Sequence, residues 1–147
     1  MNNYMTMKFK SVSENETLAR SCVTSFVLPL NPTLNDIADI KTSVSEAVTN
    51  AIIHGYEDSE GIIELTAITE GNKLTVKITD EGKGIDDISL AKEPLYTSKP
   101  EMERSGMGFT IMESFMDSID IISSPKFGTT VIMTKTIASE SCVDECC

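Results

Sequence analysis

The feature that most constrains the fold is an amphipathic segment in the first half of the 147-residue chain, between Asn31 and Gly55. Asn31-Pro32 is predicted to mark its start, since proline is tolerated in the first turn of a helix, and Gly55 its end. A helix with one apolar face has to pack against a second layer of structure. The apolar residues recur at the spacing of one helix face: Ile37, Ile40, Val44, Ala47, Val48, Ala51 and Ile52.

A second helix is predicted before this segment, over residues 14–28, where Pro29 stops it. Ser13 and Glu16 have the spacing of a capping box, in which two residues satisfy each other's backbone N–H groups. Cys22 is expected to be buried in this helix as a small apolar residue. It shares the expected apolar stripe with Leu18, Val23 and Phe26.

Alternating apolar and polar residues predict two β-hairpins and an edge strand, which together with the helices make a two-layer α/β sandwich. The length fits one domain over residues 1–147, with a frayed tail from about residue 138. A long irregular stretch runs from Glu81 to about Ser105, and loops of this length are usually lids, binding loops or disordered. The predicted strands span residues 8–12, 62–69, 73–80, 119–123 and 129–136, and a third helix spans 108–116.

Charge and cysteine content argue against several classes of protein. The chain has 12 basic and 23 acidic residues, a net charge of −11, which is unsuited to binding a nucleic-acid backbone. Cys142, Cys146 and Cys147 crowd the tail without zinc-finger spacing or a nearby histidine, so a reduced tail is expected. No apolar run approaches transmembrane length, and no signal peptide is evident. We therefore expect a cytoplasmic protein that does not bind membranes.

Two polar residues in the helix predicted between Asn31 and Gly55 are candidates for a metal-binding or catalytic role. Glu46 and Asn50 are four positions apart and therefore lie on one helix face. A carboxylate and an amide oxygen suit Mg²⁺, and the carboxylate could also orient or deprotonate a nucleophile. Most pairs at this spacing are simply solvated, so the spacing alone leaves both interpretations open.

A second candidate lies at the end of a predicted buried strand. Asp80 ends an apolar row and precedes Gly82 and Gly84, which allow a backbone to approach a ligand closely. A buried carboxylate needs a donor, and the amino group of a nucleobase is one possibility. The alternative is a tight turn in which Asp80 caps its own backbone. Thr129 shares a strand face with Val131 and could reach the same pocket.

The third candidate site lies at the start of the helix predicted over residues 108–116. Gly106 and Gly108 leave bare backbone amides at a helix start, which is a typical anion site. Ser105 lies between these glycines and Arg104, whose guanidinium suits phosphate. A glycine-rich helix start without a ligand is the alternative.

The order of these boxes resembles the GHKL ATPase superfamily over roughly residues 37–133: Glu-x-x-x-Asn, Asp-x-Gly-x-Gly, a lid, Gly-x-Gly and Gly-Thr. The resemblance implies a Bergerat-type ATP-binding fold, with a mixed, mostly antiparallel sheet and helices on one face. It also implies that Asn50 binds Mg²⁺ and that Asp80 bonds the adenine amino group. Thr129 would support that contact, and the glycine boxes would frame the lid over the phosphates.

The sequence over residues 45–56, 94–100 and 103–113 is also similar to bacterial anti-sigma serine kinases of sporulation. That similarity implies a homodimer that binds ATP or ADP, binds a sporulation sigma factor and blocks its use by RNA polymerase. It also implies ATP-dependent phosphorylation of a serine on an anti-anti-sigma protein. We expect Glu46 to serve as the base and Arg104 to hold a phosphate oxygen.

Other functions are weighed against this one. A non-catalytic module that binds adenine nucleotide and only holds a partner would not need Glu46 beside a metal ligand. A sensor histidine kinase fragment is disfavoured, because the only histidine, His54, lies inside the main helix. A structural α/β domain with coincidental glycine turns would not bind ATP.

Overall fold

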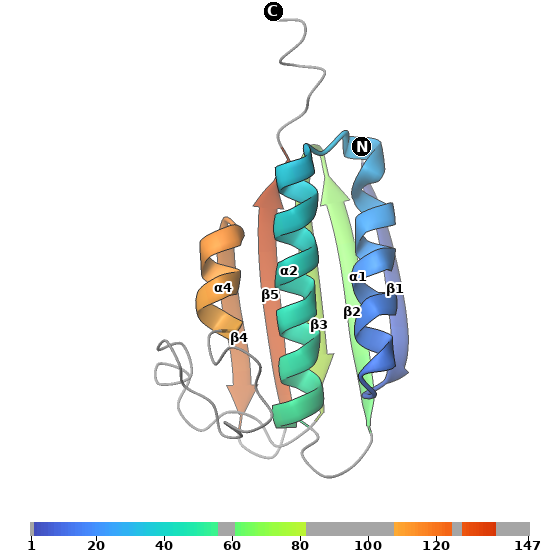
Figure 1. Cartoon of the computed structure of the whole chain (residues 1–147), viewed down its shortest axis with the longest axis vertical. Coiled ribbons are helices and arrows are strands. Elements are labelled where there is room, and N and C mark those ends of the chain that lie inside the picture. Colours follow the sequence, from blue (N-terminus) through green and yellow to red (C-terminus); the bar gives the residue numbers. More distant parts are fainter. Residues whose placement is uncertain (1, 56–60, 82–107, 125–127, 138–147) are drawn as a thin grey trace, which may run out of the picture.

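The computed structural model describes residues 2–55, 61–81, 108–124 and 128–137. Helices α1, α2 and α4 lie side by side on one face of a β-sheet, so the chain forms two layers (Figure 1). The elements in chain order are β1 (Asn2–Lys10), α1 (Glu14–Val27), a 3₁₀ turn (Leu28–Leu30), α2 (Leu34–Asn50), a π-helical turn (Ala51–Gly55), β2 (Ile62–Glu70), β3 (Lys73–Asp80), α4 (Gly108–Phe115), β4 (Ser118–Ser124) and β5 (Gly128–Thr136).

The strands are ordered β1-β2-β3-β5-β4, and each pairing among the described strands is antiparallel. The two-layer sandwich with helices on one face is therefore confirmed, and the described sheet is wholly antiparallel where a mixed one was predicted. Both hairpins form, and Gly71 in the β2–β3 turn has a φ of 62°. β1 is the predicted edge strand, but it spans Asn2–Lys10 instead of residues 8–12, because it pairs with β2 along its whole length.

The hydrophobic core lies between the sheet and the helices. Alternate strand residues face the helices, and on β3 these are Leu74, Val76 and Ile78, as the alternation predicted. Helix α2 buries Ile40 and Val44 and lies between α1 and α4, both of which it contacts (Figure 1). Burying one such aliphatic side chain contributes roughly 1.5–3 kcal/mol, so this packing fixes α2 against the sheet.

The buried face of helix α1 includes Val23 and Phe26 of the predicted stripe but is shifted from the rest of it. Its buried residues are Ala19, Val23 and Val27, whereas Leu18 is 48% exposed. Cys22 is a half-buried free thiol instead of a buried one. The small side chain of Ala19 allows α1 to lie close to its neighbours, which a stripe of larger residues did not indicate.

The capping box predicted at the start of α1 does not form. Ser13 has helical dihedral angles and makes no side-chain cap, and its hydroxyl donates to Glu14 Oε1 at 3.4 Å. Glu16 is instead directed toward α2, where its Oε2 accepts a hydrogen bond from Ser45 Oγ at 3.0 Å. A tertiary contact has therefore replaced the local one.

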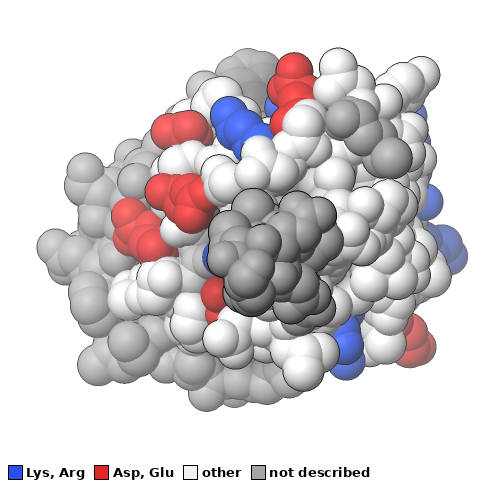
Figure 2. All heavy atoms as spheres, turned by 90° about the horizontal axis from the view of Figure 1, so that it is seen from above, with Lys and Arg blue, Asp and Glu red and all other residues white. Residues whose placement is uncertain are grey.

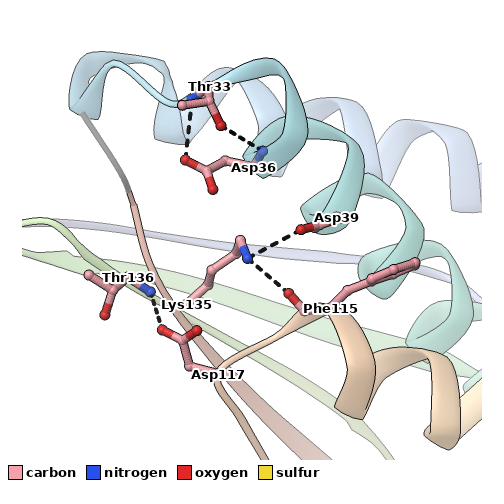
Figure 3. Close-up of polar contacts among 7 residues, drawn as sticks. All are labelled: Thr33, Asp36, Asp39, Phe115, Asp117, Lys135 and Thr136. Atoms are coloured by element: carbon pink, nitrogen blue, oxygen red, sulfur yellow. Dashed lines mark hydrogen bonds and ion pairs between the residues drawn. The ribbon is translucent and has the colours of Figure 1, made fainter. Parts of the chain in front are cut away.

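Helix α2 carries a capping box that the sequence analysis missed. Thr33 Oγ1 accepts from the Asp36 N–H at 3.0 Å, and Asp36 Oδ2 accepts from the Thr33 N–H at 3.2 Å (Figure 3). This exchange satisfies two backbone donors. The helix therefore begins after Thr33 and not at Asn31-Pro32. At the other end, helical structure continues to Gly55 through the π-helical turn, as predicted.

Several predicted features lie outside the described residues. The lid does so except for Glu81, and the tail from residue 138 does so entirely. Within the described part of the chain, no helix is long and apolar enough to cross a membrane. Figure 2 views the molecule from above and shows several acidic side chains toward the left and several basic side chains along the right edge.

Candidate functional site

Four elements present their ends at one end of the molecule. The C-terminal ends of α2 and β3 and the first residues of β5 lie at the lower end in Figure 1, and α4 begins somewhat higher, with its start directed toward that end. Asn50 ends α2, Asp80 ends β3, Gly108 begins α4, and Thr129 is the second residue of β5. The π-helical turn after α2 contacts both β3 and β5. The fold thus gathers at one end residues that are far apart in the sequence.

Asp80 and Thr129 lie directly opposite each other across the β3–β5 pair. Both are buried on the helix-facing side of the sheet, Asp80 at 5% and Thr129 at 9% exposure. Asp80 continues the row of Val76 and Ile78, so a carboxylate ends an otherwise apolar row. This register places the two residues side by side, as the expectation that Thr129 could reach the same pocket as Asp80 requires.

The Thr129 hydroxyl is held by a residue that the sequence analysis missed. Ser123 on β4 lies opposite Thr129, and the two hydroxyl oxygens are 2.9 Å apart. Ser123 Oγ also donates to the Gly128 carbonyl at 3.1 Å. Ser123 could be found from the register of the predicted second hairpin, in which it lies opposite Thr129.

Gly128 allows β5 to start close to the end of β3. It has a φ of 97°, and a Cβ built on it would lie 2.1 Å from the Asp80 carbonyl oxygen and 2.8 Å from Glu81 Cα. Residues other than glycine rarely adopt this φ, and non-bonded heavy atoms cannot approach each other so closely. The glycine is therefore required to place Thr129 beside Asp80.

Gly128→Ala is expected to lower the free energy of unfolding by at least ~2 kcal/mol, through overpacking and backbone strain. It should also weaken the nucleotide binding that the sequence predicts at this site, because the Asp80 backbone has to move. Gly71→Ala is the matched control, since Gly71 also has a positive φ but nothing lies within 4 Å of its Cβ position. Denaturant unfolding and ATP titration of both variants measure the two effects. Equal losses in the two variants would contradict the role of Gly128.

A polar row runs along α2 toward this end of the molecule. Asp39, Ser43, Glu46 and Asn50 follow one another at steps of four, three and four residues, which keeps them on one helix face. Glu46 and Asn50 are half-buried, while Ser43 is fully buried. Among the described residues, the Ser43 hydroxyl is buried without a hydrogen-bond partner. The face carrying Glu46 is thus polar along its length.

A contact between α1 and α2 fixes the rotation of this row. Ser45 Oγ donates to Glu16 Oε2 at 3.0 Å and accepts from Arg20 Nη1 at 3.4 Å. Arg20 and Glu16 also form an ion pair of 3.4 Å. Ser45 immediately precedes Glu46, so this contact helps to set the direction of the Glu46 side chain.

The donors on α2 are of the kind that a magnesium nucleotide uses. Mg²⁺ is usually bound by one or two protein oxygens, with phosphates and waters completing its coordination. Asn50 offers an amide oxygen and Glu46 a carboxylate one turn earlier, and both are half-buried rather than sealed in the core. Within the described ranges, no group of three or more His, Cys, Asp or Glu side chains could hold a metal.

The structure brings together only part of the predicted site. Asn50, Asp80 and Thr129, with Glu46 one turn from the end of α2, lie on elements that end together, and Gly108 begins α4 there. The remaining predicted site residues lie outside the described residues: Gly82, Gly84, Arg104, Ser105 and Gly106.

Comparison with known proteins agrees with this geometry. The family model described as the histidine kinase-like ATPase domain matches residues 10–135. A solved structure of the RsbU and RsbW domains of a Mycobacterium tuberculosis protein aligns with a TM-score of 0.65 and 20% identity, over 92% of this chain and 32% of that one. This likeness bears on the fold alone, and this chain spans about a third of that longer chain. These matches confirm the predicted GHKL-type fold.

Curated relatives are similar over nearly their whole length. An anti-sigma F factor of Thermoanaerobacter sp. (strain X514) is 54% identical over 138 residues, which is 94% of this chain and 96% of the relative. One of Oceanobacillus iheyensis is 52% identical over 144 residues, with 97% and 99% coverage. The fold and the gathered residues thus define a histidine kinase-like ATPase domain. Within that class, the chain belongs to the family of the anti-sigma F factors.

Proposed function

We propose that this protein is an ATP-dependent protein serine kinase that also acts as an anti-sigma factor. It binds a sporulation sigma factor, blocks its use by RNA polymerase, and phosphorylates a serine of an anti-anti-sigma protein. The observation that carries the proposal is the buried Asp80–Thr129 pair, on strands that end beside the helix of Glu46 and Asn50. The similarity to anti-sigma F factors supports the choice of partners.

The cellular location and the oligomeric state are proposed from the similarity to the same family. The protein works in the cytoplasm as a homodimer, and it contacts neither nucleic acid nor membrane. The net charge of −11 supports the first exclusion, since binding phosphate backbones needs a basic face.

Asp80 is proposed to select adenine. Its buried carboxylate accepts a hydrogen bond from the exocyclic amine, and Thr129, with its hydroxyl 2.9 Å from that of Ser123, supports the contact. Guanine presents a carbonyl at this position, which would leave the buried carboxylate facing another acceptor. That mismatch costs about 1–3 kcal/mol, so the site discriminates against GTP.

The phosphates are proposed to lie between the end of α2 and the start of α4. Asn50 would hold Mg²⁺, which would supply positive charge to neutralise the phosphates. Glu46 orients the attacking serine hydroxyl or accepts its proton as the serine oxygen bonds to the γ-phosphorus and ADP leaves. Arg104 holds a phosphate oxygen as charge spreads. Backbone N–H groups for the phosphates come from the glycine boxes, with Gly82, Gly84, Ser105, Gly106 and Gly108.

Two measurements test this function. Equilibrium titrations should show ATP bound more tightly than GTP, by roughly 5- to 150-fold on the cost of the mismatch. Incubation with γ-labelled ATP and the anti-anti-sigma protein of the same organism should place label on a serine. Binding of ATP and the sigma factor without label transfer would instead indicate a non-catalytic nucleotide-binding module. Equal affinity for GTP and ATP would reject the role of Asp80.

A further inference from the structure

Lys135 is a buried lysine that none of the functions above uses. It lies on the helix-facing side of β5, near the end of the strand, and is 8% exposed. Its side chain extends between α2 and α4, as Figure 3 shows. The ammonium Nζ donates to the Phe115 carbonyl oxygen at 2.9 Å and lies 3.4 Å from Asp39 Oδ2. Buried lysines are rare unless they are paired, and these two contacts supply the pairing for Lys135.

The first partner places Lys135 at the C-terminal end of α4. Phe115 is the last residue of α4, where carbonyl groups lack intrahelical donors and a positive charge is favourable for the helix dipole. The neighbouring chain is also tied to β5. Asp117 Oδ2 accepts from the Thr136 N–H at 2.6 Å (Figure 3), and the Asp117 N–H donates to the Thr134 carbonyl at 2.8 Å. The end of α4 is thus anchored on both sides of Lys135.

The second partner connects Lys135 to the polar row of α2. Asp39 begins the row that continues through Ser43 to Glu46 and Asn50. At 1.5 Å per residue, Asp39 and Asn50 are separated by roughly 16 Å along the helix axis. Lys135 therefore joins the second turn of the helix that carries the proposed base and metal ligand to α4, whose first residue is Gly108.

We infer that Lys135 is a positioning residue for the phosphate half of the nucleotide site. Helix α4 has eight residues and is about 12 Å long, so holding its last carbonyl also directs its first turn. Because the same ammonium pairs with α2, it sets the spacing between the helix of Glu46 and Asn50 and the start of α4. Asp80 and Thr129 lie on β3 and β5 and are held by the sheet. This inference rests on the proposed function, since it assigns the start of α4 to phosphates.

Lys135→Met tests the inference, because methionine fills a similar volume without the charge. Equilibrium titrations of the purified full chain compare Mg·ATP with adenosine, which lacks phosphates. The Kd for Mg·ATP is expected to rise roughly 2- to 30-fold, the range seen when a coupled residue outside a site is changed. The Kd for adenosine should stay within the error of the wild type. A role in stability alone would not separate the two ligands.

Lys8→Met is the matched control. Lys8 lies on edge strand β1 with its side chain 68% exposed and 3.6 Å from Glu64, so the change removes the same charge without touching α4. Its two Kd values should equal those of the wild type. Unchanged Mg·ATP affinity in Lys135→Met, or an equal loss for both ligands, overturns the inference. Wild-type protein that binds no ATP would overturn the proposed function itself.

Asp39→Asn keeps the test decisive if Lys135→Met does not fold. It removes the ion pair at 3.4 Å but leaves the Lys135 bond to Phe115 at 2.9 Å. Asp39 has a side chain 30% exposed, so an amide is tolerated there. A smaller loss of Mg·ATP affinity, again without a loss for adenosine, is expected. No selective loss in this variant overturns the inference.

Discussion

Glu46→Gln is expected to lower the rate of serine phosphorylation by roughly 10²–10⁴, the usual contribution of general-base catalysis. Phosphoryl transfer needs little from the protein beyond positioning and charge stabilisation. One group that receives the serine proton therefore accounts for a large share of the rate enhancement. Glutamine keeps the size of Glu46 but cannot accept that proton. Binding of ATP and inhibition of the sigma factor should remain close to those of the wild type.

Single-turnover transfer from γ-labelled ATP to the anti-anti-sigma protein measures this effect separately from binding. Glu64→Gln is the matched control, because Glu64 lies on the sheet face away from the helices, where its Oε2 is 3.6 Å from Lys8. The control should phosphorylate at the normal rate. A Glu46→Gln rate near that of the wild type would reject Glu46 as the base and leave it only a supporting role in the helix.

The secondary structure was largely predictable because its signals are local. The β2–β3 hairpin was predicted within a residue, since alternation of apolar residues and the turn at Gly71 agree. Helix α2 was predictable from its apolar face. The predicted start of α2 at Asn31-Pro32 was wrong, because the helix begins at the Thr33–Asp36 capping box two residues later.

Contacts between elements were less predictable. Ser13 and Glu16 have the capping-box spacing, yet Glu16 bonds Ser45 on another helix, and a local pattern contains no information on that competition. The burial of Lys135 was not predictable either, since a lysine in an alternating strand is expected to be solvated. Its burial depends on Asp39 and the end of α4, which only the packed structure brings together.

The site was predictable in its parts and not in its assembly. Alternation placed Asp80 and Thr129 each on an inward face of its own strand. Their meeting depends on β3 pairing with β5, which are separated along the chain by α4 and β4. The need for Gly128 follows from the same pairing, because the close approach of β5 to the Asp80 carbonyl excludes a side chain there.

Asn50→Ala is expected to abolish the magnesium dependence of ATP binding. Magnesium in nucleotide sites takes few protein ligands, so the loss of one amide oxygen is large compared with the total contribution of the protein. Asn50 is the last residue of α2 and is half-buried. Alanine has a higher helix propensity than asparagine, so the fold should be retained.

Titrations of ATP with excess magnesium and with a chelator measure the effect directly. The wild type should bind more tightly with magnesium, whereas Asn50→Ala should give the same affinity under both conditions. Asn35→Ala is the matched control, because Asn35 is an exposed asparagine in the first turn of the same helix, at the end remote from Asp80 and Thr129. The control should keep the full magnesium effect. If Asn50→Ala also keeps it, Asn50 is not the magnesium ligand, and the metal must be held by the phosphates and by other residues.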